Sequence, residues 1–433
     1  MDPITVAGFG ILFMFLLILL QVPIGIAMAV AGTVGFGILS GFKPALTIIG
    51  TESSSIISNA DLAVIPLFLL MGNFATSAGL SGDIYNLAYA FLGHRRGGLA
   101  LSTIAGCGFF GAVCGSSTAT AATFGRVALP EMLERRYAPH FAAGCIAAGG
   151  TLGSLVPPSV ILIIYAVLAE EFIITLFIAA IIPAIISIAS YFAAISIYLR
   201  INPKAGPPGP RMNWPERIKT VLRCRGVIFI LLVVVGGIYG GIFTVTEAAA
   251  FGTVLCFLFA LVRRKLTRSN FWDALTGTAV SASMIYVIII GANVMTYFVT
   301  VTHMPDNLIN LIAGLQLPTF VVLTILLFVY LLLGSIFDTV AAMLITLPFV
   351  LPLITDMGYS PIWWGIVNVV IIEIGMITPP IGLNVFILQR VAPDIPLSTI
   401  FRGILPFLFA DITRLIILVA FPVLILWLPA ILH

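Results

Sequence analysis

The residues with the clearest chemical potential are short strings of small and hydroxyl-bearing residues inside long apolar segments. Residues 115–120 read Gly-Ser-Ser-Thr-Ala-Thr, and residues 334–339 read Gly-Ser-Ile-Phe-Asp-Thr. Two further strings, residues 149–158 and 375–380, begin with glycine and end in a proline pair. Proline leaves carbonyl groups without an amide donor, and glycine exposes the backbone. Such carbonyl and hydroxyl oxygens are hard ligands that suit Na⁺, while the N-termini of interrupted helices offer amide groups to an anion.

Two carboxylates and one amide accompany these strings. Asp338 stands between apolar neighbours, and a carboxylate in such a position must be paired, protonated or close to a cation. Glu373 comes two residues before Gly375, and Asn384 follows the second proline pair by about one turn. For both carboxylates a structural hydrogen bond to a neighbouring helix is the alternative to a role at an ion site.

The composition places these strings inside a membrane protein. Of 433 residues, 61% are hydrophobic and 9% are charged, and the mean hydropathy is +1.19, whereas about a quarter of the residues of soluble domains are charged. The length and the apolar runs predict roughly ten membrane-spanning helices of about 20 residues each. The net charge of +3 is too small to suggest a nucleic-acid partner.

No string of the sequence points to catalysis. The chain contains no GxxxxGK[ST], HExxH or GxSxG pattern, which argues against an ATP motor, an intramembrane protease and an esterase. Residues 106–111 match GxGxxG, but no strand precedes them, so we interpret the match as chance. We therefore expect a protein that is not an enzyme and that draws energy from an ion gradient or a partner.

An internal repeat with an offset of 222 residues relates the two halves of the chain. Six landmarks share this offset without a gap: Pro130 and Pro352, Tyr137 and Tyr359, Pro139 and Pro361, Gly153 and Gly375, and the pairs Pro157-Pro158 and Pro379-Pro380. The sequence therefore predicts residues 1–199 and 226–433 as two related halves, joined by a polar linker over residues 200–225.

The distribution of charge predicts that these halves have opposite orientations. Eleven of the 20 Lys and Arg residues lie between Arg200 and Arg268, and positive loops are typically cytoplasmic. Residues 269–388, by contrast, contain neither Lys nor Arg. We expect a re-entrant hairpin over about 98–130 that enters from the cytoplasm and its counterpart over about 320–353 that enters from the periplasm. Opposed repeats with interrupted helices are typical of secondary transporters.

Five strings, found in the same order across the chain, resemble a known family. They are GSSTATAATFG, PEMLERRY, AAGGTLGSLVPPS, FTVTEAAAFG and GMITPPIGLNVF. They are similar to those of the large (M) membrane subunit of tripartite ATP-independent periplasmic (TRAP) transporters, which belong to the ion transporter superfamily. Val245 is one departure, because the family usually has proline at this position.

The resemblance implies a Na⁺-coupled importer of organic acids in the bacterial inner membrane. It implies an all-α polytopic fold of two inverted-topology repeats with re-entrant hairpins and discontinuous helices, in which a transport domain moves against a scaffold like an elevator. Residues 84–92 and 307–315 would link the two parts. A soluble periplasmic binding protein (P) would deliver the substrate, and a separate four-helix membrane subunit (Q) would brace the scaffold in the lipid bilayer.

The resemblance also implies particular site residues. The first Na⁺ site would involve Ser116, Ser117, Gly149 and Gly153. The second would involve Gly334, Asp338, Gly375 and Thr378. The substrate would lie between the hairpin tips, near Ser117, Thr118, Pro157, Pro379 and Asn384.

Two other functions remain open at this point. A stand-alone Na⁺/dicarboxylate symporter of the same superfamily would share the hairpins but need no binding protein. An ion channel would use the glycine-rich breaks as a filter. The substrate itself stays open among C4-dicarboxylates, sialic acids and other sugar acids.

Overall fold

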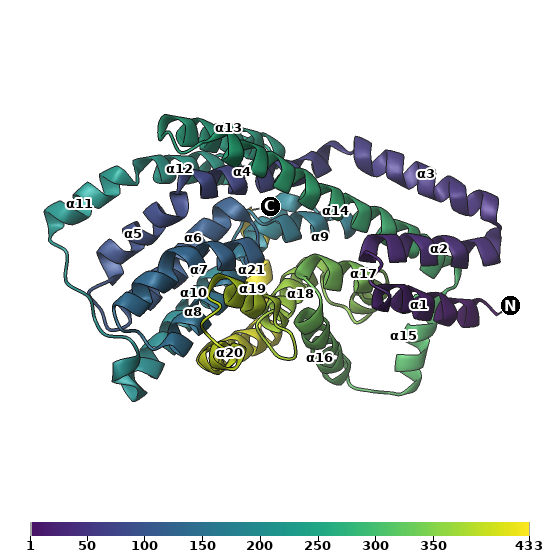
Figure 1. Cartoon of the computed structure of the whole chain (residues 1–433). Coiled ribbons are helices and arrows are strands. Elements are labelled where there is room, and N and C mark those ends of the chain that lie inside the picture. The colour runs from purple at the N-terminus through teal and green to yellow at the C-terminus, as the bar shows by residue number, and fades with distance from the viewer. Residues whose placement is uncertain (1, 433) are drawn as a thin grey trace.

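The computed structural model describes residues 2–432, which form helices joined by short turns without any β-strand (Figure 1). In chain order the elements are α1 (Pro3–Leu19), α2 (Ile24–Ser40), α3 (Phe42–Ser58), η1 (Ala60–Ala63), α4 (Val64–Ala78), α5 (Leu80–Leu92), α6 (Gly98–Cys114), α7 (Ser117–Glu134), α8 (Pro139–Leu155), α9 (Val160–Leu168), α10 (Ile173–Ile201), η2 (Pro203–Ala205), α11 (Trp214–Arg223), α12 (Arg225–Tyr239), α13 (Val245–Val262), α14 (Arg268–Val301), α15 (Met304–Gly314), α16 (Thr319–Ile336), α17 (Thr339–Asp356), α18 (Pro361–Gly375), α19 (Leu383–Val391), α20 (Leu397–Ala420) and α21 (Val423–Leu432).

Fewer helices cross a full bilayer than the roughly ten expected from the sequence. Within residues 2–432, seven helices are long and apolar enough to cross a membrane, or up to nine if each of two bent pairs forms one span. The difference arises because several apolar helices are a few residues too short. Helices α6 and α8 have 17 residues each and α18 has 15, so at about 1.5 Å per residue they fall short of the ~30 Å hydrocarbon core.

The helices pack as two groups. In one group α2 and α4 pack along α14, and α13 packs along α4 at the upper edge of the molecule in Figure 1. In the other group α7 and α20 pack on α8, α16 packs on α18, and α10 packs on α20. Helices α5 and α15, which contain the residues predicted as connecting arms, contact α4 and α14 of the first group, respectively, and also α6 and α17 of the hairpins.

The internal repeat of the sequence reappears in the structure. Ser117 and Thr339 begin α7 and α17, and Pro139 and Pro361 begin α8 and α18, at the same offset of 222 residues. Helices α6 and α7 form one hairpin and α16 and α17 form the other, which we call hairpin 1 and hairpin 2. Helix α8 continues into α9 after a break with a bend of 41°, and α18 is followed by α19 after a break over residues 376–382.

The two hairpins enter the molecule from opposite ends, with α14 running past both. The base of hairpin 1 is tied to the linker, because the amide of Gly97 donates to Gly206 O at 3.1 Å and that of Ala138 to Ala205 O at 3.0 Å. Near the start of α14, Arg263 pairs with Asp83 of α5 on this same side. The base of hairpin 2 instead lies beside Thr300 at the far end of α14, across a shared cavity.

The expected linker contains a helix of its own. Helix α11 begins with a capping box, in which Asn213 and Glu216 satisfy each other's backbone amides. Its apolar residues Trp214, Ile218 and Leu222 are four positions apart and are all exposed. This segment is therefore an amphipathic helix packed on α5, not only a flexible connection.

Candidate functional site

A cavity of about 270 Å³ lies where the two hairpin tips face the middle of α14. Hairpin 1 contributes residues 115–118, hairpin 2 contributes residues 338–340, and the midsection of α14 contributes Ser281, Met284, Ile285 and Ile288. The N-termini of α7, α9 and α17 all border this space. Since helix N-termini carry partial positive charge, the cavity suits an anion although no lysine or arginine is among its described lining residues.

The tip of hairpin 1 is a tight polar turn. Ser116 caps α7 through a bond from the amide of Ala119 at 3.4 Å, and its carbonyl accepts from Thr120 Oγ1 at 2.7 Å. The amide of Ser117 donates to Ser154 Oγ at 3.1 Å, which joins the tip to the end of α8. A side chain at Gly153 would place its Cβ 2.5 Å from Ser116 O, so only glycine lets α8 approach this tip.

The structure brings three of the four residues predicted for the first ion site together. Ser116, Ser117 and Gly153 meet at the tip of hairpin 1. Gly149 lies one turn earlier inside α8, where it faces Cys107 and Ile104 of α6. Within the predicted string of residues 149–158, the described helix continues through the glycines to Leu155 and breaks at residues 156–159, because only there do prolines remove the amide donors.

Hairpin 2 repeats this contact at its own broken helix. A Cβ on Gly375 would lie 2.6 Å from the backbone carbon of Gly334, so α16 and α18 touch through their main chains. Thr378 follows in the break and donates to Ile374 O at 2.6 Å. Asp338 is the N-cap residue of α17 and stands in the wall of the cavity. The residues predicted for the second ion site therefore lie around the contact between α16 and α18. Asp338 lies on the side of this contact that faces the cavity.

The predicted substrate residues divide into two groups. Ser117 and Thr118 line the cavity. Pro157, Pro379 and Asn384 are not among its described lining residues: Pro157 is buried behind α8, and Pro379 is exposed. Asn384 is fully buried and contacts the tip of hairpin 1, because its Nδ2 donates to Ser117 Oγ at 2.8 Å.

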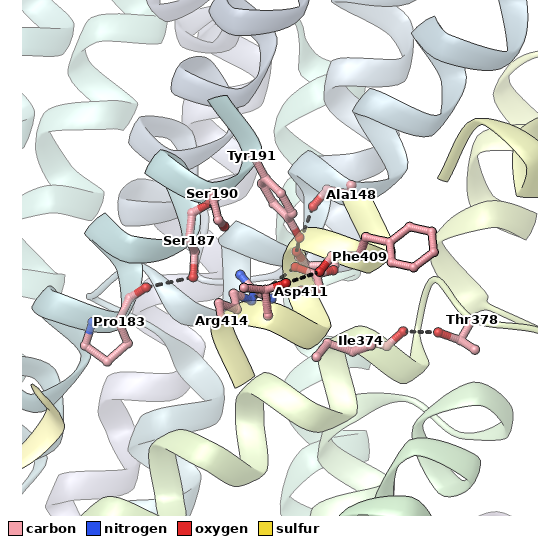
Figure 2. A network of polar contacts seen from close by, with 12 residues as sticks. Ala148, Pro183, Ser187, Ser190, Tyr191, Ile374, Thr378, Phe409, Asp411 and Arg414 are labelled. Carbon is pink, nitrogen blue, oxygen red and sulfur yellow. Dashed lines mark hydrogen bonds and ion pairs between the residues drawn. The ribbon is translucent and has the colours of Figure 1, made fainter. Parts of the chain in front are cut away.

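The sequence reasoning missed a buried ion pair next to this region. In α20, Arg414 Nε lies 3.1 Å from Asp411 Oδ1, and both side chains are at most 1% exposed. Figure 2 shows the pair beside Tyr191 of α10, whose ring centre is 5.3 Å from the guanidinium carbon. The Tyr191 hydroxyl is in turn 2.9 Å from Thr151 Oγ1 of α8. Two charges at positions i and i+3 of an apolar helix were the signal for this pair.

A second cavity of about 920 Å³ continues along α9, α14 and α17 toward α15. Its lining includes three acidic residues, Glu52, Glu170 and Asp306. Glu52 is held in place by Asn293 Nδ2 at 2.9 Å and by the Tyr297 hydroxyl at 3.1 Å. The first cavity therefore has a wider, acidic neighbour on the side of the hairpin-2 base.

A comparison with protein-family models matches residues 11–424 to the DctM component of tripartite ATP-independent periplasmic transporters. The chain belongs to this family. The TRAP family is a family of transporter permeases and not a class of enzymes, and the apolar helices agree with a multi-pass membrane protein.

Individual relatives of this TRAP permease agree with the family. It is 34% identical to a C4-dicarboxylate TRAP transporter large permease of Pseudomonas aeruginosa, over 85% of this chain and 86% of that protein. It is 30% identical to a sialic acid TRAP transporter large permease of Vibrio cholerae, over 86% and 87%. The YdaH transporter of Alcanivorax borkumensis shares the fold, with a TM-score of 0.55, 13% identity and 88% coverage of both chains.

Proposed function

We propose that this TRAP permease imports an organic acid together with Na⁺ across the bacterial inner membrane. In this proposal it works with a periplasmic binding protein (P) and a four-helix membrane subunit (Q). The observation that carries the proposal is the meeting of both hairpin tips and the scaffold helix α14 at one cavity. A site between two opposed repeats can be opened to either side when one group of helices moves against the other, as an elevator does.

The chemistry of the cavity supports coupling to a cation. Three helix N-termini favour an anionic substrate, yet Asp338 brings a carboxylate into the same wall. An anion and a carboxylate repel each other in a space of low dielectric constant unless a cation lies between them. Na⁺ as a co-transported ion meets this requirement, and backbone and hydroxyl oxygens around Gly153 and Gly375 are suitable ligands for two such ions.

The charge distribution supports the orientation. Arg95, Arg136 and the linker arginines gather at the base of hairpin 1, so this end faces the cytoplasm in the proposal. Burial lowers the pKa of His94 at this end, and the neighbouring cations Arg217 and Arg211 lower it further. The second, acidic cavity then opens toward the periplasm, where P would deliver the substrate.

The names of the relatives support the substrate class. C4-dicarboxylate and sialic acid permeases both carry carboxylate substrates, so we propose an acid of this kind or a related sugar acid. The described lining of the cavity contains no lysine or arginine that could pair with the carboxylate of one of these acids. Selection would therefore rest mainly on P.

Reconstitution tests the proposal. Liposomes containing this chain with Q should accumulate substrate only when P is outside and a Na⁺ gradient points inward. Uptake by the chain alone would favour the stand-alone symporter, and ohmic current without coupled uptake would favour the channel. Unchanged uptake after replacing Na⁺ with choline would contradict the proposed ion coupling.

A further inference from the structure

Glu373 occupies the point where the two repeats meet. It is the third-last residue of α18 and is only 1% exposed. Thr339 Oγ1, at the start of α17, donates to Glu373 Oε1 at 2.8 Å. The hydroxyl groups of Ser117 and Ser154, both in the first repeat, also face this carboxyl group. One side chain of the second repeat therefore touches the tips of both hairpins and the end of α8.

Two oxygen atoms of this cluster lack a hydrogen-bond donor. Neither Glu373 Oε2 nor Asn384 Oδ1 forms a hydrogen bond of ordinary geometry with any described residue, although both atoms are buried. Asn384 belongs to the same cluster, because its Nδ2 donates to Ser117 Oγ. A buried oxygen without a donor is costly, and for a carboxylate the cost is several kcal/mol. Two such oxygens beside serine hydroxyls form the kind of donor set that binds a small cation.

The negative charge of Glu373 also has no cation of its own among the described residues to balance it. The buried cation Arg414 acts on Glu373 electrostatically. Its guanidinium, however, is already paired with Asp411 at 3.1 Å. The buried group therefore holds two carboxylates against one guanidinium, and a monovalent cation would bring it to neutrality.

The first repeat has no carboxylate of its own at this place. At the offset of 222 residues, Glu373 corresponds to Thr151 and Asp338 corresponds to Ser116. The residues predicted for the first ion site are therefore all neutral. Glu373 reaches across to Ser117 and Ser154 from the other repeat and can supply the missing charge.

We infer that Glu373 is an anionic ligand of the first Na⁺ site, shared between the repeats, with Ser154 and the Asn384 amide oxygen as further oxygen donors. The inference rests on the proposed Na⁺ coupling. It assigns the first ion site to both repeats, so Na⁺ bound there would join hairpin 1 to α18 and to the tip of hairpin 2.

The test compares Glu373→Gln with wild type and with Glu134→Gln, a control at an exposed carboxylate near the base of hairpin 1. Purified protein is heated in increasing NaCl, with choline chloride keeping the ionic strength constant, and Na⁺-driven uptake is measured in proteoliposomes. We expect Glu373→Gln to raise the Na⁺ concentration that gives half of the maximal thermal stabilisation, or half of the maximal uptake, about 10-fold or more. This change corresponds to ~1.4 kcal/mol. Its unfolding temperature without Na⁺ should not fall, because an uncompensated charge has been removed.

Two further variants keep the test decisive if Glu373→Gln does not fold. Glu373→Asp retains the charge and should restore part of the Na⁺ response, whereas Ser154→Ala should weaken Na⁺ binding by a few-fold. A wild-type Na⁺ response in Glu373→Gln or in Ser154→Ala would overturn the inference and leave Glu373 as a structural partner of Thr339. Absence of any Na⁺ response in wild type would instead overturn the proposed function, and the shared ligand with it.

Discussion

The two repeats have the same backbone plan but different charges. Each has a hairpin whose first helix touches a broken helix through glycine, at Gly153 in one repeat and Gly375 in the other. In place of Ser116 and Thr151 of the first repeat, the second has Asp338 and Glu373. The two repeats therefore provide two similar sets of backbone oxygen atoms, while the negative charge beside these sets comes from the second repeat alone. Variants that disturb a backbone contact shared by both repeats, or that remove a charge found only in the second repeat, test this view.

The largest expected effect is an all-or-none difference in labelling. Arg136→Cys at the base of hairpin 1 and Asp356→Cys at the base of hairpin 2 should react with a membrane-impermeant thiol reagent from opposite sides, because the hairpins enter from opposite ends. Both positions are exposed, and the five native cysteines are buried, so background labelling should be low. Labelling of both from the same side would disprove the inverted arrangement.

The next effect concerns the buried ion pair, which only the second repeat has. Arg414→Gln should lower the free energy of unfolding by about 3–5 kcal/mol, because it leaves Asp411 buried without its partner. Helix α10, the counterpart in the first repeat, has no charged residue before Arg200. Denaturant unfolding of the purified protein measures the loss. The double variant Asp411→Asn/Arg414→Gln should lose less than the single variant, and an equal or larger loss would show that the pair does not act as a unit.

A smaller effect tests the shared backbone contact. Gly153→Ala should reduce uptake roughly 5- to 150-fold, as expected for a strain of about 1–3 kcal/mol, because its Cβ would meet the backbone of the hairpin-1 tip. Gly149→Ala is the matched control on the same helix. Its Cβ would lie 2.9 Å from Cys107 Sγ, a side-chain atom that has more freedom to shift. Initial uptake rates at saturating Na⁺ compare the two, and an equal loss in both would argue against a special role of Gly153.

Much of this arrangement could be predicted from the sequence because its signals are local. Proline pairs and glycines at a fixed offset predicted both hairpins and both broken helices. The exact position of the break within residues 149–158 could not be predicted, because glycine also occurs inside continuous membrane helices, as Gly149 does, where it allows close packing. Helix α11 was interpreted as linker, although the pairing of Asn213 with Glu216 and the four-residue apolar spacing were readable signals.

Contacts between distant segments could not be predicted. Asn384 and Ser117 are 267 positions apart in the chain, and nothing in either local string indicates that they meet. Tyr191 likewise gains its role only when α20 brings Arg414 against it. A single sequence shows which residues are unusual in a membrane, and the fold decides which of these face one another.

The smallest effect compares a charged with a neutral oxygen at the two hairpin tips. Asp338→Asn should raise the Na⁺ concentration for half-maximal uptake about 10-fold, since an interaction with a charged group contributes about 1.5 kcal/mol at the low end of its range. Ser117→Ala should raise it only about two- to three-fold, because a neutral hydroxyl contributes ~0.5 kcal/mol at the low end of its range. Asp356→Asn, at the exposed base of hairpin 2, is the control for losing a carboxylate elsewhere. If Ser117→Ala and Asp338→Asn shift the Na⁺ dependence equally, the negative charge of the second repeat does not set the difference between the two proposed ion sites, and the duplicated backbone alone accounts for both.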